Sequence, residues 1–110
     1  MFDMMKMMGK MKEVQQKMKE AQEELKDITT HGESGGGMVK ATANGQKEII
    51  GLEIDESLIN LTDKNMMRDL IIAASNKALR EAEEKSKEHI KKSTEGLIPN
   101  IPGLDLSGLA

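Results

Sequence analysis

The sequence of 110 residues contains no cysteine, tryptophan or tyrosine, and Phe2 is its single aromatic residue. The missing cysteines exclude disulfides, thiol nucleophiles and cysteine-based zinc sites. The missing aromatics exclude folds that bind single-stranded nucleic acid by stacking bases on aromatic side chains. The two histidines, His31 and His89, stand too far apart to form a metal pair on one helix, so we predict no metal site and no cofactor.

Long hydrophobic runs are also missing. No apolar run approaches the ~18 residues of a membrane span, and the methionine-rich start lacks the pattern of a signal peptide. We therefore expect a soluble, cytoplasmic protein without membrane association. No nucleophile, base and orienting group can be named together, which argues against an enzyme and against a small-molecule substrate. Gly35-Gly36-Gly37 is followed by neither a helix nor a Lys-Ser or Lys-Thr pair, so it predicts a turn and not a phosphate-binding loop.

The net charge of −3 conceals two basic segments. Residues 1–19 carry five lysines against two acidic residues, and residues 64–92 carry eight basic residues against five acidic ones. The rest of the chain is acidic. Such segments are compatible with phosphate binding, and equally with helix surfaces whose lysines only face solvent.

An amphipathic helix is predicted near the N-terminus, because its apolar residues alternate at spacings of three and four. These seam positions are Met4, Met7, Met11, Val14, Met18, Ala21, Leu25 and Ile28. A repeat of this kind favours a helix that packs along its length against another helix, in the same chain or in a second copy. On a helical wheel, one row of lysines lies on each side of the seam. The two rows are Lys6, Lys10 and Lys17, and Lys12, Lys19 and Lys26.

Six methionines fall within the first eleven residues. A soft-metal site or a surface for hydrophobic peptides would use such residues, but the seam already explains Met4, Met7 and Met11. Met5 and Met8 widen the apolar face at this end. We therefore favour the packing interpretation.

A small antiparallel sheet is predicted in the middle of the chain. Residues 38–43 and 47–54 form a hairpin around Asn44-Gly45, a pair typical of type I′ turns with positive φ at both positions. Ile50, Leu52 and Ile54 are expected on one buried face of the second strand. Residues 28–33 would add a third strand, which a stable sheet requires.

A second, longer helix is expected to begin at about residue 63, with Asp63 near its start. Its apolar arc is widened by Ile72 and Leu79 in the first half of the helix, and beyond Leu79 the helix is expected to turn polar. The residues of the arc are Met67, Leu70, Ile71, Ala74, Ala78 and Ala82. An outward stripe of basic residues is predicted on the helix, consisting of Lys77, Arg80, Lys87 and Lys91. Pairs four residues apart would absorb part of the charge of this helix, and they are Glu81 with Lys85 and Glu83 with Lys87. We expect one domain over residues 1–95 and an apolar tail, interrupted by proline and glycine, over residues 96–110.

Three stretches carry a resemblance to a known family. They are residues 10–25, residues 32–45 followed by Ile54-Asp55-Glu56-Ser57-Leu58, and residues 69–79. With them the chain resembles the YbaB/EbfC family of bacterial nucleoid-associated DNA-binding proteins. The resemblance implies an α+β fold in the order α-β-β-β-α and an intertwined homodimer whose N-terminal helices project like the arms of tweezers. It also implies binding to double-stranded DNA. Proline is common in the family where this chain has Glu56.

The leading hypothesis is a nucleoid-associated protein that binds double-stranded DNA as a homodimer, largely through contacts of lysine and arginine with phosphates. The predicted DNA-binding residues are Lys6, Lys10, Lys12, Lys17, Lys19, Lys77, Arg80, Lys87 and Lys91. The predicted dimer or packing residues are Met11, Val14, Met18, Leu25, Ile50, Leu52, Leu70 and Ala74. The alternative is a coiled-coil interaction or chaperone-like module whose methionine-rich arms grip apolar segments of a partner. With two arginines in the chain, strong base-specific readout is not indicated.

Overall fold

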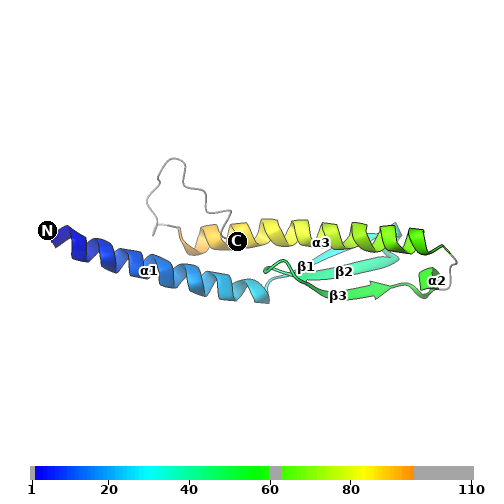
Figure 1. Ribbon diagram of the computed structural model, residues 1–110, viewed down its shortest axis with the longest axis horizontal. Helices are drawn as coiled ribbons and strands as arrows, with labels where there is room; N and C mark the ends of the chain where they lie inside the picture. Colours follow the sequence, from blue (N-terminus) through cyan, green and yellow to red (C-terminus); the bar gives the residue numbers. More distant parts are fainter. Residues whose placement is uncertain (1, 60–62, 96–110) are drawn as a thin grey trace.

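The computed structural model of the protein describes residues 2–59 and 63–95 (Figure 1). The helices are α1 (Phe2–Glu24), α2 (Glu56–Ile59) and α3 (Lys64–Ser93), and the strands are β1 (Thr29–Ser34), β2 (Val39–Asn44) and β3 (Ile49–Ile54). This order confirms the predicted α+β fold with a helix, a three-stranded antiparallel sheet and a second long helix. The predicted tail, residues 96–110, lies outside the described residues.

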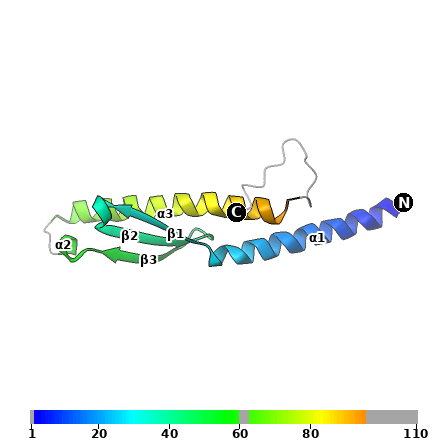
Figure 2. The same cartoon turned by 180° about the vertical axis from the view of Figure 1, so that it is seen from behind.

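The molecule is elongated, with principal extents of 73 × 24 × 17 Å. Helix α1 and the sheet follow one another along the long axis, and α3 runs beside both (Figure 1). Seen from behind, α1 again extends past the last turn of α3, with the N-terminus farthest from the sheet (Figure 2). One long helix therefore ties the sheet to the base of α1.

The sheet has the order β1-β2-β3, and both pairings are antiparallel. The β1–β2 pairing runs from Thr29 opposite Asn44 to Ser34 opposite Val39. The segment Gly35–Gly37 joins these two strands with φ values of 61°, 68° and 93°, a left-handed conformation that favours glycine. The predicted turn at the glycine run is confirmed.

The hairpin between β2 and β3 lies where the sequence predicted it, but the predicted type I′ turn is wrong. The N–H of Lys47 donates to the carbonyl of Asn44 at 3.0 Å, so Asn44 is the first residue of the turn and not a central one. Among the described non-glycine residues, Lys47 alone has a positive φ, at 64°. The side-chain Oδ1 of Asn44 accepts from the N–H groups of Gln46 and Glu48, at 2.9 and 3.2 Å.

Gly45 is needed for a different reason from the one predicted. Its N–H donates to the carbonyls of Leu25 and Ile28, at 2.9 and 3.1 Å. A Cβ atom built on Gly45 would lie 2.4 Å from the Leu25 carbonyl oxygen. The glycine thus lets the hairpin approach the end of α1, a contact that no local pattern reveals.

Strand β3 breaks the expected alternation. Gly51 pairs with Thr42 and Ile49 with Ala43, so Ile50 is the extra residue of a β-bulge. Because directly opposed residues share a face, Ile49 lies on the same face as Leu52, opposite to the prediction. Helix α3 packs on β1 and β2 and barely reaches β3. As a result, the expected burial of Ile50 and Leu52 is wrong for the single chain, where they are 57 % and 45 % exposed.

The inner face of β1 is made of small and hydroxyl-bearing residues. Thr30 Oγ1 donates to the carbonyl of Ala78 at 2.8 Å, and Ser34 Oγ donates to the carbonyl of Leu70 at 2.5 Å. Between them, a Cβ on Gly32 would lie 2.3 Å from the carbonyl oxygen of Ala74. The backbones of β1 and α3 therefore approach more closely than larger side chains would allow.

Helix α3 begins as predicted, since Asp63 accepts from the N–H groups of Asn65 and Met66 at 3.1 Å each. The expectation that it turns polar beyond Leu79 is wrong on one face. Its buried positions continue at intervals of four residues, namely Ala74, Ala78, Ala82, Ser86 and Ile90. Ala82 still belongs to the core formed with the sheet, whereas Ile90 is buried because it packs on Ala21 and Leu25 at the end of α1.

The predicted N-terminal helix is confirmed as α1, but α3 packs on its seam over only part of its length. Ala21 and Leu25 are buried against Ile90, with Met18 partly buried beside them. Nearer the N-terminus, Met4, Met7 and Met11 are 61–69 % exposed. Within the described chain, packing of one helix on another thus covers the C-terminal part of the seam alone.

Candidate nucleic-acid interface

The part of α1 that extends beyond α3 is the most exposed regular element of the described chain. We call residues 4–17 the arm. Every side chain in it is exposed except that of Val14, which is partly buried. The first seam residue that contacts α3 is Met18. The arm is therefore a helix that leaves the body of the protomer with nearly its whole circumference accessible (Figure 1).

The lysines of α1 are largely free of acidic partners. Lys17 lies 3.9 Å from Glu20, with both side chains about half exposed. None of the other four predicted lysines of this helix makes an ion pair with a residue whose side chain the structure describes, in the ranges 4–59 and 63–95; they are Lys6, Lys10, Lys12 and Lys19. Their charge is available to an external anion.

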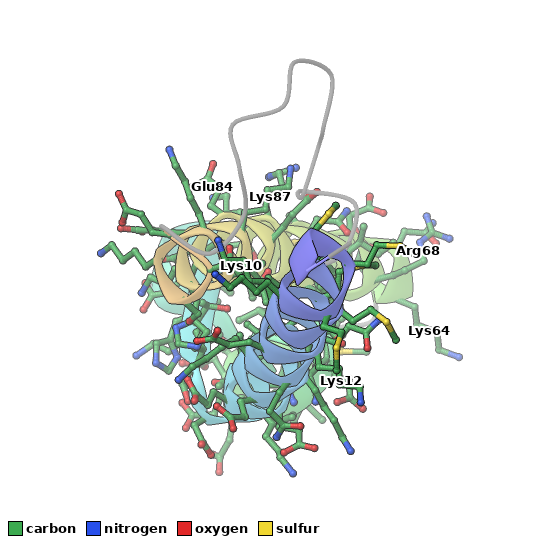
Figure 3. The ribbon with its side chains drawn as sticks, turned by 90° about the vertical axis from the view of Figure 1, so that its left-hand side faces the viewer. Lys10, Lys12, Lys64, Arg68, Glu84 and Lys87 are labelled. Carbon is green, nitrogen blue, oxygen red and sulfur yellow. The ribbon has the colours of Figure 1, made fainter. Side chains whose placement is uncertain are left out.

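These lysines leave α1 in more than one direction. Viewed along the molecule from the N-terminal end, Lys10 and Lys12 point to different sides of the helix, and Lys87 projects from α3 (Figure 3). A flat anionic surface would contact one row of the arm's lysines. A groove with negatively charged walls would contact the rows on both sides of the helix.

Two of the four residues in the basic stripe predicted on α3 have partners within the protomer, and one of these partners is an acid. Lys87 Nζ lies 3.2 Å from Glu83, and the predicted Glu81–Lys85 pair is also present, at 3.6 Å. Lys77 Nζ donates to the backbone carbonyl of Glu33 at 3.1 Å. The two remaining predicted residues of the stripe are exposed and have no ion pair among the described residues; they are Arg80 and Lys91.

The predicted packing residues fall into three groups. Three lie in the interior of the protomer or against its core: Leu25, Leu70 and Ala74. Two on α1 are partly buried: Val14 and Met18. Three are exposed in the single chain: Met11, Ile50 and Leu52. The last group leaves apolar surface uncovered at two places, the arm and β3.

Sequence reasoning missed the contact that fixes the base of the arm. His89 Nε2 lies 2.8 Å from Glu24 Oε2, joining α3 to the end of α1 across 65 positions of sequence. The neighbouring Ile90 is buried against Ala21 and Leu25. The four-residue spacing of Ala82, Ser86 and Ile90 was a usable signal for burial, although it does not identify α1 as the partner.

Two carboxyl groups have lowered pKa values, and both are at the surface. The Ser57 hydroxyl, and then its backbone N–H, hold the pKa of Asp55 below its ordinary value. A hydrogen bond and charge attraction from Lys92 lower the pKa of Glu88. Each cause is a local partner within four residues, as in ordinary helix-end and i,i+4 contacts.

Other kinds of site find little support in the part of the chain that the structure describes. No group of three or more His, Cys, Asp or Glu side chains there could hold a metal ion. No helix among the described residues is long and apolar enough to cross a membrane. His31 lies exposed on β1, where its Nδ1 is 3.3 Å from the hydroxyl of Thr42. The arm and its lysines are the feature that stands out.

Comparisons with known proteins identify the family of the chain. The sequence profile of the YbaB/EbfC DNA-binding family matches residues 1–97. A nucleoid-associated protein of Thermoanaerobacter pseudethanolicus is 43 % identical over 103 residues, covering 94 % of this chain and 91 % of that protein. A nucleoid-associated protein of Staphylococcus carnosus is 44 % identical over 78 residues, covering 71 % of this chain and 72 % of that protein.

A solved structure shares the fold. The crystal structure of an uncharacterized protein from Helicobacter pylori has a TM-score of 0.66 and 32 % sequence identity, and the match covers 74 % of this chain and 86 % of that one. The sequence profile, the relatives and the arrangement of helices around a three-stranded sheet all point the same way. The chain belongs to the YbaB/EbfC family of nucleoid-associated DNA-binding proteins.

Proposed function

We propose that the protein binds double-stranded DNA as a homodimer, chiefly through contacts of lysine and arginine with phosphates, and thereby acts on nucleoid organisation or gene expression. One observation carries the proposal. The arm projects from the protomer with three lysines that have no acidic partner among the side chains that the structure describes, Lys6, Lys10 and Lys12, whereas several basic residues elsewhere on the surface are paired with acids. Duplex DNA carries closely spaced phosphates, which can pair with these lysines.

The free energy of this contact would come mainly from the release of counterions. For each phosphate that the protein neutralises on duplex DNA, the binding constant falls with roughly the 0.9 power of the salt concentration. A dimer doubles the number of available lysines. The protein is acidic on average, with a pI of about 5.4, so the attraction depends on the local positive potential of the arms.

Uncovered apolar surface on β3 supports the homodimer. Ile49, Ile50 and Leu52 are 41 %, 57 % and 45 % exposed, and they lie on an edge strand. Exposed apolar residues on an edge strand mark a surface for association. A second copy covering β3 would bury them. Sedimentation equilibrium should then give about twice the chain mass of 12.1 kDa.

A charge placed on β3 tests this interface. Leu52→Lys should shift the sedimenting species to a monomer, because a lysine would be buried without a partner. The matched control is Asn76→Lys on the exposed face of α3, which should leave the mass unchanged. A wild-type monomer at micromolar concentration would contradict the dimer.

Binding to DNA is tested by fluorescence anisotropy with a labelled duplex at several salt concentrations. We expect affinity to fall steeply with salt, and to be largely lost in a variant with glutamine at four positions of α1: Lys10, Lys12, Lys17 and Lys19. The control replaces four cations that are already paired with acids, again by glutamine: Lys40, Arg68, Lys85 and Lys92. Both variants change the net charge by the same amount. No binding at low salt would contradict the function.

The alternative function is a module that grips apolar segments of a protein partner. The exposed methionines of the arm favour it, because methionine adapts to varied apolar surfaces. In that case the lysines would serve solubility. The two variants above would then bind DNA equally well, or wild-type protein would not bind DNA at all.

A further inference from the structure

The arm carries more than lysines. Five of its methionines are largely exposed: Met4 (69 %), Met5 (79 %), Met7 (61 %), Met8 (59 %) and Met11 (61 %). At 100° per residue, four of them fall within about 100° of arc, and they are Met4, Met7, Met8 and Met11. We call these four the methionine face. Apolar surface of this extent on a projecting helix indicates contact with another molecule.

The lysines border this face on both sides. By the same count, Lys10 and Lys12 lie about 100° from its centre in opposite directions, in agreement with the different sides on which they leave α1 (Figure 3). Lys6 lies on the same side as Lys10. A molecule that binds this side of the arm must therefore present an apolar strip between two negatively charged edges.

A second copy of the arm does not meet this requirement. In a coiled coil, oppositely charged residues beside the seam attract across the interface. Beside this seam the arm has Lys10 and Lys17 on one edge and Met8 and Gln15 on the other, with no acid. Two paired arms would therefore gain no attraction of this kind, and in the antiparallel arrangement they would oppose lysine to lysine.

The major groove of DNA does meet it. An α-helix with its side chains is about 10–12 Å wide, and the groove of B-DNA is about 12 Å wide. Phosphates line its two walls, and its floor includes the C5-methyl group of every thymine. The arm of 14 residues is about 20 Å long, enough to cross several base pairs.

Resting on the proposed DNA binding, we propose that the arm lies in the major groove with the methionine face on the floor and its lysines on both walls. The methionines contact thymine methyl groups, so the protein favours thymine-rich sites through apolar contact. Hydrogen bonding by arginine to base edges is not required, which suits a chain with two arginines outside the arm.

The test removes the methyl groups from the DNA. A labelled thymine-rich duplex is compared with the same duplex containing deoxyuridine at every thymine, which keeps the charge and the hydrogen-bonding groups. Wild-type protein should bind the uracil duplex more weakly, by about fourfold for each methyl group that the arm no longer touches. The salt dependence should be the same for both duplexes, because no phosphate contact changes.

Protein variants show whether the methionine face is responsible. Replacing its four residues by glutamine should abolish the preference for thymine without changing the salt dependence. Replacing them by leucine should preserve the preference, and would also rule out a role for the sulfur atoms. Met66→Gln, at a residue of α3 that is 42 % exposed, should behave as wild type.

The outcomes separate this inference from the proposed function. Equal binding of both duplexes by wild-type protein, with a steep salt dependence, overturns the inference and leaves DNA binding intact. A glutamine variant that still prefers thymine overturns it too, since the preference then reflects DNA shape. A glutamine variant with a lower sedimenting mass than wild type shows that the face joins two copies, and also overturns it. No binding at low salt contradicts the proposed function itself.

Discussion

The imidazole Nε2 of His89 lies 2.8 Å from the carboxylate of Glu24 and joins the second half of α3 to the end of α1. The next residue, Ile90, is buried against the seam of α1. A polar contact and an apolar one thus lie side by side where the arm begins. Together they set the direction in which the arm leaves the protomer.

Loss of the His89–Glu24 contact should loosen this junction modestly. The two side chains are 30 % and 56 % exposed, so we expect His89→Ala to lower the free energy of unfolding by about 1 kcal/mol or less. Urea unfolding at a fixed protein concentration measures this change in the free energy of unfolding. Glu24→Gln, which keeps a hydrogen-bonding oxygen, should cost less than His89→Ala. An equal or larger loss would show that the charge, and not the hydrogen bond, is what matters.

Two glycines should respond to alanine in opposite directions. In Gly32→Ala the new Cβ would meet the backbone of α3 at 2.3 and 2.5 Å, so we expect a loss of about 3 kcal/mol or more. Gly9 lies in exposed α1 with nothing within 4 Å of a new Cβ. Gly9→Ala should therefore stabilise the helix by about 0.5–1 kcal/mol. Thermal unfolding followed by circular dichroism compares the two. A harmless Gly32→Ala would contradict the close approach of β1 to α3.

Asn44 should hold the β2–β3 turn through its side chain. Asn44→Ala leaves the N–H groups of Gln46 and Glu48 without their acceptor, and we expect a loss of about 1–3 kcal/mol. Hydrogen exchange of these two amides should accelerate. Asn44→Asp keeps the acceptor oxygen and should protect both amides better than alanine does. Unchanged exchange in Asn44→Ala would argue that the backbone alone holds the turn.

Stability near Asp55 should depend on pH with a defined sign. The pKa of this carboxyl is lowered in the folded state by the Ser57 hydroxyl first and by the Ser57 N–H second. The contribution is therefore present above the ordinary carboxyl pKa and is lost as the pH falls through the lowered value. Ser57→Ala should raise the pKa of Asp55 toward the ordinary range in a carbon-13 NMR titration. It should also destabilise the protein at neutral pH and have no effect in strong acid.

The ion pairs on α3 predict how DNA affinity can be raised. Glu83→Gln removes the partner of Lys87, which lies 3.2 Å away, and should strengthen DNA binding if the α3 stripe contacts phosphate. The salt dependence should then steepen by up to roughly one further phosphate. Glu81→Gln frees Lys85, which lies outside the predicted stripe, and is the matched control for charge. Equal gains from both variants would indicate a general effect of net charge.

Local patterns in the sequence predicted the elements well. The helix predicted from the apolar repeat of α1, the cap at Asp63 and the turn at the glycine run all depend on neighbours within a few positions, and all three are confirmed. The i,i+4 pairs of α3 are confirmed for the same reason.

Contacts between distant segments were harder to predict. The Asn44-Gly45 pair gave the place of the hairpin but the wrong turn, because Gly45 is constrained by the Leu25 carbonyl. The bulge at Ile50 changed the predicted alternation at one end of β3, because it puts Ile49 on the same face as Leu52, and such a bulge depends on pairing with β2. Ile90, isolated among charged residues, is buried by a helix that lies far away in sequence.

For the candidate site, the sequence located the basic residues but not their partners. The lysines of the arm are exposed, as a helical wheel suggests. Which of the α3 cations find partners depends on rotamers, as for Lys87 with Glu83, and on the position of β1, whose Glu33 carbonyl accepts a hydrogen bond from Lys77. Their contacts with DNA stay a prediction until they are measured.

The elongated outline of the protomer has a consequence for measuring its association in solution. A particle of 73 × 24 × 17 Å diffuses more slowly than a sphere of equal mass, so it leaves a gel-filtration column early. The apparent mass from gel filtration would then be too high for a single chain, and too high for a dimer as well. Mass should therefore be taken from light scattering or sedimentation equilibrium, and the high frictional ratio becomes a signature of the projecting arm. Cutting the arm back should bring that ratio toward the value for a compact particle.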